Sequence, residues 1–252
     1  MDNKTKKHNG ITQILPAIKR RIEDFLIPPL CIICDGALEG DKWFCASCLD
    51  ALAKNHGARD ACPRCSGNRR KRECACEFAW DFPFETVYSA YDYDDTLSAV
   101  ARHIKYKGKS QLAYHMGFIT APLLPRGFIG GGDIVIPVPL HRARMRKRGY
   151  NQAEYFARGI LKGLGRNLEP LRTDLLTRVR NTGTQTKLDR EGRLKNLEGA
   201  FAANPETLGE LSGKRVVLVD DIFTTGATTE ACTDELLRAG CSAVRVLAMG
   251  HD

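Results

Sequence analysis

The residues best suited to chemistry in this chain are two adjacent carboxylates, Asp220 and Asp221, followed by a run rich in threonine and glycine, 224–229. Four apolar residues, 216–219, precede them and predict a buried strand, whereas 231–239 has the apolar spacing of a helix. The acidic pair and the threonines are therefore expected in a strand-to-helix turn. Such turns are where α/β sheets bind their ligands.

A phosphate is the ligand expected in this turn. Backbone N–H groups at the start of a helix lack intrahelical partners and lie at the positive end of the helix dipole. A glycine lets the backbone approach closely, and threonine hydroxyls add donors. Carboxylates just before a phosphate can accept hydrogen bonds from the vicinal hydroxyls of a sugar. We therefore predict a 5-phosphoribosyl ligand held by Asp220, Asp221, Thr224, Thr225, Gly226, Ala227 and Thr228.

A second predicted strand, 133–139, ends in prolines and is followed by five cations within seven residues, expected on a turn. Like charges held together are unfavourable unless an anion lies nearby, so we predict that Arg142, Arg144 and Arg148 face a pyrophosphate. An exposed basic loop or a nucleic-acid contact is the alternative interpretation. The basic run 105–109, at a predicted helix end, is equally compatible with a solvated helix terminus and with phosphate or nucleic-acid binding.

The segment 177–196 is long, polar and rich in arginine, and it connects a predicted short strand, 171–176, to an apolar segment at Ala200 and Phe201. Long loops within compact domains are often active-site lids. We therefore expect this loop to close over the reacting centre, with catalytic candidates Gln185, Arg190 and Arg193.

Eight of the ten cysteines lie between residues 31 and 76, in four closely spaced pairs. Two thiolates at this spacing hold one side of a tetrahedral Zn²⁺ site, and two such pairs complete it. A disulfide-bonded module is the alternative, but the chain shows no export signal, and the cytosol keeps thiols reduced. We predict one or two structural zinc ions bound by Cys31, Cys34, Cys45, Cys48, Cys62, Cys65, Cys74 and Cys76.

The pairing of these cysteines stays open at the level of sequence. Sequential pairing joins the first pair to the second and the third to the fourth, whereas a cross-braced arrangement joins the first to the third and the second to the fourth. The spacing of Cys74 and Cys76 is tighter than that of a standard zinc turn, which leaves the second site less secure. Four-sulfur sites have no open position, so the metal is expected to be structural.

The run VVLVDDIFTTGAT, 216–228, resembles the phosphoribosyl-pyrophosphate (PRPP) motif of type I phosphoribosyltransferases, except that the bulky Phe223 stands where a smaller aliphatic residue is usual. With the cysteine pairs and the runs IPVPLHRARMRKRGYNQAE and RVRNTGTQTKLDREGRLKNLEGAF, the chain resembles the ComF/GntX family along nearly its whole length. The resemblance implies an α/β type I phosphoribosyltransferase core, a parallel sheet flanked by helices, behind a small N-terminal cysteine-rich zinc-ribbon module.

For function, the resemblance implies Mg²⁺-dependent transfer of a 5-phosphoribosyl group from PRPP to an unassigned acceptor, with release of pyrophosphate. It also implies, for some members, a role in natural competence and DNA uptake. The alternative is a non-catalytic protein that senses PRPP or a nucleotide, or an adaptor that binds single-stranded DNA beside a competence helicase.

Length and composition agree with a soluble protein, because 43% of the 252 residues are hydrophobic and no apolar run approaches the roughly 20 residues that cross a bilayer. We expect a cytoplasmic protein without an integral membrane segment. The net charge of +8 and pI of about 9.0 fit polyphosphate ligands and nucleic acid alike. The predicted domains are a tail with an amphipathic helix packed on the body, 1–30, the zinc ribbon, 31–80, and the phosphoribosyltransferase-like domain, 81–252.

Overall fold

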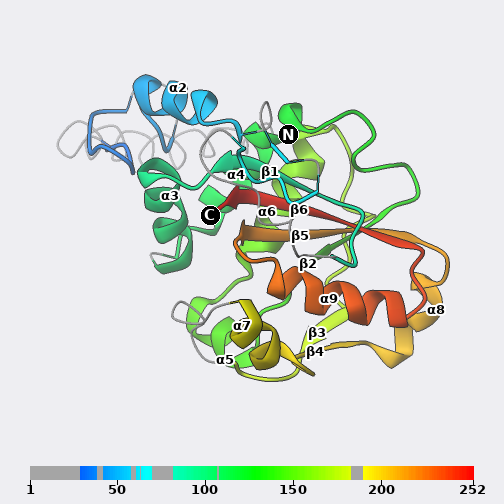
Figure 1. Cartoon of the computed structure of the whole chain (residues 1–252). Coiled ribbons are helices and arrows are strands. Elements are labelled where there is room, and N and C mark those ends of the chain that lie inside the picture. Colours follow the sequence, from blue (N-terminus) through cyan, green and yellow to red (C-terminus); the bar gives the residue numbers. More distant parts are fainter. Residues whose placement is uncertain are drawn as a thin grey trace, which may run out of the picture. The chain divides into compact units, whose positions relative to one another are not determined.

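The computed structural model describes residues 29–38, 42–57, 61–62, 64–69, 82–106, 108–182 and 190–252 (Figure 1). The chain divides into two compact units, 1–51 and 52–252. The predicted N-terminal amphipathic helix lies outside the described residues. The predicted domain boundary at residue 80 stays a prediction, because 70–81 lies outside them as well.

A parallel sheet forms the centre of the larger unit. Its four strands run in the order β1 (Thr86–Asp92), β6 (Ala243–His251), β5 (Arg215–Phe223) and β2 (Ile134–Pro137). The apolar residues 216–219 of β5 are buried on both faces, as expected for the centre of a parallel sheet covered on both sides. The predicted fold class, a parallel sheet flanked by helices, is confirmed.

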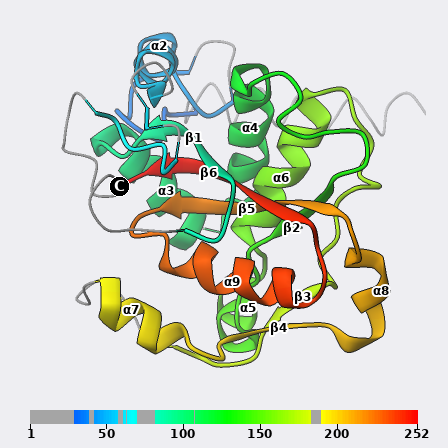
Figure 2. The ribbon, with the colours of Figure 1, turned by 45° about the vertical axis from the view of Figure 1, so that its right-hand side comes forward.

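Helices cover both faces of this sheet (Figure 2). The helices α4 (Ser110–Thr120) and α6 (Gln152–Gly163) lie on one face, and α9 (Ala227–Arg238) lies on the other. α4 and α6 pack backbone to backbone, since a Cβ on Gly117 would lie 2.1 Å from the carbonyl oxygen of Phe156 and one on Gly159 would lie 2.0 Å from that of Tyr114. Glycine is required at both positions for this close approach.

A smaller, antiparallel sheet joins β3 (Leu176–Arg178) to β4 (Phe201–Ala203). The predicted strand at 171–176 was therefore misplaced, and only an isolated parallel bridge links Leu171 to Val135 of β2. The predicted lid also contains regular structure, because it begins within β3 and ends in α7 (Arg190–Leu197). The residues between, 183–189, are not among those described.

The predicted basic turn at 142–148 is instead a helix, α5 (Arg142–Arg148). Its first turn is capped by His141, whose Nδ1 accepts a hydrogen bond from the Ala143 N–H at 3.2 Å. Gly149 ends the helix in the left-handed conformation, at φ 82°. This helix is not evident from the sequence because histidine is not among the preferred N-cap residues.

The remaining elements are short or peripheral: α2 (Ala46–Lys54), α3 (Asp95–Tyr106), α8 (Leu208–Leu211) and the 3₁₀ turns η3 (Ala121–Leu123) and η4 (Pro205–Thr207). Within the described ranges, every helix is too short or too polar to cross a bilayer.

Candidate functional site

The predicted phosphate turn lies at the carboxyl end of β5, but it is shorter than the sequence indicated. β5 continues through Phe223, because β6 pairs with it as far as the register partners Phe223 and His251. Asp220 and Asp221 are therefore strand residues rather than turn residues. The turn itself consists of residues 224–226, and α9 begins at Ala227, which places Thr228 in its first helical turn.

The start of α9 is suited to bind a group that accepts hydrogen bonds. Gly226 is the N-cap at φ 80°, and it offers no side-chain oxygen to the first N–H groups of the helix. The Oγ1 of Thr225 is buried and has no hydrogen-bond partner among the described residues. Buried hydroxyls are normally paired, so this orphaned one points to a bound group. An anion at the N-terminus of a twelve-residue helix satisfies both features.

Gly226 is also needed for a packing reason that the sequence did not indicate. A Cβ at this position would lie 2.7 Å from Cε1 of Phe82 and 3.0 Å from Cζ of Phe223, and φ is positive. The bulky Phe223 is accommodated in the same aromatic cluster, with ring centroids 6.2 Å from Phe82, 6.1 Å from Phe84 and 5.3 Å from His251. Phe223, which departs from the usual PRPP motif, thus packs behind the turn.

The two carboxylates of the acidic pair differ in their surroundings. Successive side chains of a strand point to opposite faces, and Asp221 forms an ion pair with Lys105 of α3, with Nζ and Oδ2 2.8 Å apart. Asp220 instead accepts a hydrogen bond at Oδ1 from the Asp221 N–H at 2.8 Å. In the sequence Lys105 belongs to a basic run, and nothing in that run signals its pairing with β5.

These surroundings shift the pKa values of the two carboxyl groups in opposite directions. Burial, and then the charge of Asp221, raise the pKa of Asp220 well above its usual range. Burial acts on Asp221 too, but the Lys105 ammonium outweighs it and holds the pKa of Asp221 below its usual value. The pair therefore combines a carboxyl whose surroundings favour the protonated form, which can donate as well as accept a hydrogen bond, with one whose surroundings favour the ionised form.

A cavity of about 510 Å³ opens beside the end of β2, between α5 and β3. The charged and titratable groups in its lining are His141, Arg142, Glu154 and Arg178. The other two predicted pyrophosphate ligands do not line this cavity: Arg144 donates to the Thr182 carbonyl oxygen at 3.1 Å, and Arg148 donates to Oε1 of Gln152.

Arg178 is a residue to which sequence analysis gave no role. It lies on β3 and is buried, and its guanidinium donates to the Thr182 hydroxyl. Of the predicted lid residues, Gln185 lies outside the described residues, and Arg190 and Arg193 belong to α7 with side chains that are not described. Their catalytic roles stay predictions.

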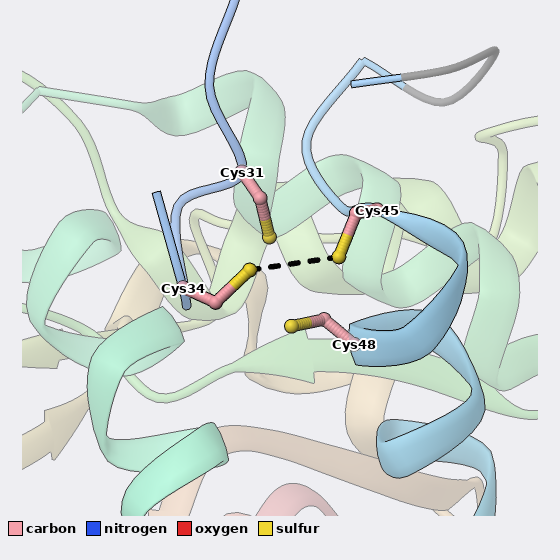
Figure 3. Close-up of side chains that lie close together, drawn as sticks. All are labelled: Cys31, Cys34, Cys45 and Cys48. Atoms are coloured by element: carbon pink, nitrogen blue, oxygen red, sulfur yellow. Dashed lines mark hydrogen bonds between the residues drawn. The ribbon is translucent and has the colours of Figure 1, made fainter. Parts of the chain in front are cut away.

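Four cysteines of the smaller unit form a compact cluster (Figure 3). Cys31 and Cys34 come from one turn, Cys45 precedes α2, and Cys48 lies in its first turn. All four sulfurs lie within 4.8 Å of one another, and those of Cys34 and Cys45 are 3.6 Å apart. Sulfurs bound to one tetrahedral zinc at about 2.3 Å would be about 3.8 Å apart, so the donor set and geometry fit a metal ion such as zinc.

The first site therefore uses sequential rather than cross-braced pairing. A hydrogen bond from Ser47 lowers the pKa of Cys45 to about 6, which favours the thiolate that a metal requires. In the larger unit, Cys62 and Cys65 are buried and are not joined in a disulfide. Their predicted partners Cys74 and Cys76 lie outside the described residues, so a second metal site stays a prediction.

Comparison with known proteins identifies a phosphoribosyl transferase domain at residues 151–249, a range that includes Arg178, the acidic pair and the turn before α9. DNA utilization protein YhgH of Salmonella typhi is 28% identical over 227 residues, 87% of this chain and 96% of that protein. Competence protein ComFC of Bacillus subtilis is 24% identical over 234 residues, 85% and 91% of the two chains. Competence protein F of Haemophilus influenzae is 34% identical over 119 residues, 47% and 50% of the two chains.

Proposed function

We propose that this chain, which belongs to the ComF family and carries a phosphoribosyltransferase-type domain, binds a 5-phosphoribosyl ligand such as PRPP at the turn between β5 and α9. The observation that carries the proposal is the buried Thr225 hydroxyl, which has no partner among the described residues and lies beside the N-terminus of α9. A phosphate oxygen there would accept hydrogen bonds from this hydroxyl and from the backbone N–H groups of the first helical turn.

The acidic pair would hold the sugar, with a separate role for each carboxyl. The raised pKa of Asp220 favours its protonated form, which can exchange hydrogen bonds in both directions with ribose hydroxyls. Asp221 is the ionised member and is neutralised by Lys105. A hydrated Mg²⁺ that arrives with PRPP would approach the same carboxylates, and Lys105 would compete with it for Asp221.

The reaction that this arrangement supports is transfer of the phosphoribosyl group. The bond between C1 of ribose and the pyrophosphate oxygen breaks with its electron pair leaving on pyrophosphate, a nucleophile of the acceptor bonds to C1, and the acceptor loses a proton. The protein's part is to position the sugar and to stabilise the separating charges. The basic residues around the cavity, Arg142 and Arg178 among them, are suited to the leaving anion.

We further propose that the cysteine cluster of the smaller unit binds Zn²⁺ as a structural ion. Cys31, Cys34, Cys45 and Cys48 would occupy all four positions of a tetrahedral site, so the ion would stabilise the fold of this unit. The chemistry at the β5 turn does not involve it.

Sequence-independent binding of single-stranded DNA is a second candidate function, and one surface favours it. Arg142, Arg146 and Lys147 of α5 are exposed, and two groups of relatives are called competence and DNA utilization proteins. Lys105, which the sequence suggested as part of the same surface, is paired with Asp221. The α5 cations alone would give weak binding that falls steeply with salt. On this basis we propose a role in DNA uptake or use, in the cytoplasm.

The PRPP proposal is tested by calorimetry with Mg²⁺–PRPP and with ribose 5-phosphate. Thr225→Val keeps the size of the side chain and removes the orphaned hydroxyl, so affinity should fall about 10-fold for a lost interaction of about 1.4 kcal/mol. Thr233→Val is the matched control, because its hydroxyl is also buried without a described partner but lies further along α9. Wild-type affinity in T225V, or no binding by the wild type, would refute the proposal and leave the DNA-binding alternative.

A further inference from the structure

Arg178 holds a positive charge in a place that the fold does not explain. Only 8% of its surface is exposed, and its Nε has no hydrogen-bond partner among the described residues. The guanidinium lies over the ring of Phe201, 5.1 Å from the centroid, and Nη2 donates to the Thr182 hydroxyl. No carboxylate of the described residues forms an ion pair with it. A buried, unpaired charge is costly, so an arginine that only supported β3 and β4 would be expected to have its N–H groups satisfied.

A second guanidinium approaches the same residue from another element. Arg144 of α5 donates from Nη2 to the Thr182 carbonyl oxygen at 3.1 Å. Burial, followed by the charge of Arg144, lowers the pKa of Arg178, which means that the folded protein disfavours its positive charge. Two cations that converge on an uncharged threonine repel each other, and an anion between them would remove the repulsion.

The position of Arg178 makes it accessible to such an anion. Its side chain lines the cavity of about 510 Å³ together with Arg142 and His141. The charge of Asp220 raises the pKa of Arg178, so the acidic pair lies within electrostatic range of this cavity residue. A group bound at Arg178 would therefore belong to the same ligand as a sugar at Asp220, or to its reaction partner.

We infer that Arg178, Arg144 and Thr182 form an oxyanion seat, separate from the Thr225 turn, that binds a phosphoryl or carboxylate group. Guanidinium groups match both kinds of oxyanion, because their N–H donors lie in one plane. The inference extends the proposed function, since it assigns a second anionic group to the ligand. The seat would also bind a free anion whether or not the turn binds phosphate. The anion is either the pyrophosphate of PRPP or an anionic group of the acceptor.

The test measures binding of pyrophosphate, of succinate as a dicarboxylate, and of ribose 5-phosphate by calorimetry. Arg178→Met removes the charge and keeps an unbranched side chain over Phe201. We expect its affinity for pyrophosphate or for succinate to be at least ~10-fold weaker, or about 1.4 kcal/mol, while ribose 5-phosphate binds as before. Arg180→Met is the matched control, since Arg180 lies two residues further along and is exposed, and it should change affinity by less than ~3-fold.

Which anion loses affinity identifies the source: pyrophosphate assigns the seat to the leaving group, and succinate assigns it to the acceptor. Binding of pyrophosphate that depends on Arg178, in a protein that does not bind ribose 5-phosphate, would refute the proposed function and leave the seat standing. Binding of both anions that is equal in the wild type and R178M, or absent from the wild type, would overturn the seat.

A melting experiment separates a seat from a structural brace. In buffer without phosphate or carboxylate, R178M should melt no lower than the wild type, because it removes an unpaired buried charge. Added pyrophosphate or succinate should raise the melting temperature of the wild type but not of R178M. Arg178→Lys keeps the charge and should recover part of the affinity. A lower melting temperature of R178M without anion, together with no recovery in R178K, would make Arg178 a structural residue and overturn the inference.

Discussion

Two cysteine turns in this chain share a pattern of backbone hydrogen bonds but differ in their surroundings. In the first turn, Cys31 N–H donates to the Gly36 carbonyl at 2.8 Å and Asp35 N–H donates to the Cys31 carbonyl at 2.9 Å. In the second turn, the corresponding bonds join Cys62 to Gly67 and Ser66 to Cys62, both at 2.8 Å. The residue after the second cysteine is left-handed in both, with φ of 56° at Asp35 and 62° at Ser66.

The surroundings of the two turns show that one local fold supports two kinds of contact. The first turn supplies half of a four-sulfur cluster. The second turn lies along the outer edge of β1, where Val87 N–H donates to the Arg64 carbonyl at 3.2 Å and Ser89 N–H donates to Ser66 Oγ at 2.9 Å. Unpaired strand edges are prone to aggregation, so this turn also protects the edge of the sheet. A cysteine turn can therefore pair with the edge of a sheet as well as contribute to a metal site.

The largest expected effect concerns the zinc ion proposed for the first turn. Cys34→Ser with Cys48→Ser removes two of four ligands, and zinc binding in small sites is worth roughly 10 kcal/mol or more. We expect zinc content, measured by elemental analysis of reduced protein, to fall by one equivalent, and residues 29–51 to become sensitive to protease. Cys241→Ser, at a cysteine outside the four pairs, is the control and should keep its zinc. Unchanged zinc content in the double variant would mean that this cluster holds no metal.

A smaller effect is expected at the edge of β1. Ser66→Ala removes the acceptor of the Ser89 N–H, which is buried, and an unsatisfied buried donor costs about 1–3 kcal/mol. The free energy of unfolding, from urea titration followed by circular dichroism, should fall by that amount. Ser98→Ala is the control: its hydroxyl accepts only a long 3.4 Å bond from Tyr93, so a loss below about 0.5 kcal/mol is expected. Equal losses in the two variants would argue against an edge-protecting role for the second turn.

The same contrast between local and distant interactions explains what the sequence could predict. The turn before α9 and the first cysteine cluster were predicted because their residues are adjacent in sequence and their spacing is diagnostic. The end of β5 was misplaced because pairing with β6 extends the strand past Asp221. Lys105 and Arg178 were missed because α3 and β3 bring them to the acidic pair from about 116 and 42 positions away, a juxtaposition that no local pattern encodes.

The smallest expected effect tests whether the two turns share one conformation. A left-handed backbone disfavours residues with a Cβ by roughly 1 kcal/mol, and glycine avoids that cost. The variants Asp35→Gly and Asp35→Ala both lack the carboxylate, so their difference in stability reports only the backbone preference of the first turn. Ser66→Gly and Ser66→Ala give the same quantity for the second turn, because both lack the hydroxyl bonded by Ser89.

Since the two φ angles differ by only a few degrees, we expect glycine to be favoured over alanine by about 1 kcal/mol in both turns, with the two differences equal to within about 0.5 kcal/mol. Hydrogen exchange at increasing urea, in zinc-containing buffer, measures the two stability differences separately. One is read from peptides within residues 29–51 and the other from peptides within residues 52–252. The single variants differ in sign: D35G should be neutral or stabilising, whereas S66G should destabilise, since the lost Ser89 bond outweighs the backbone gain. If the alanine variant is as stable as the glycine variant at position 66 but not at position 35, the second turn does not hold the conformation of the first. The two turns would then resemble each other in sequence only.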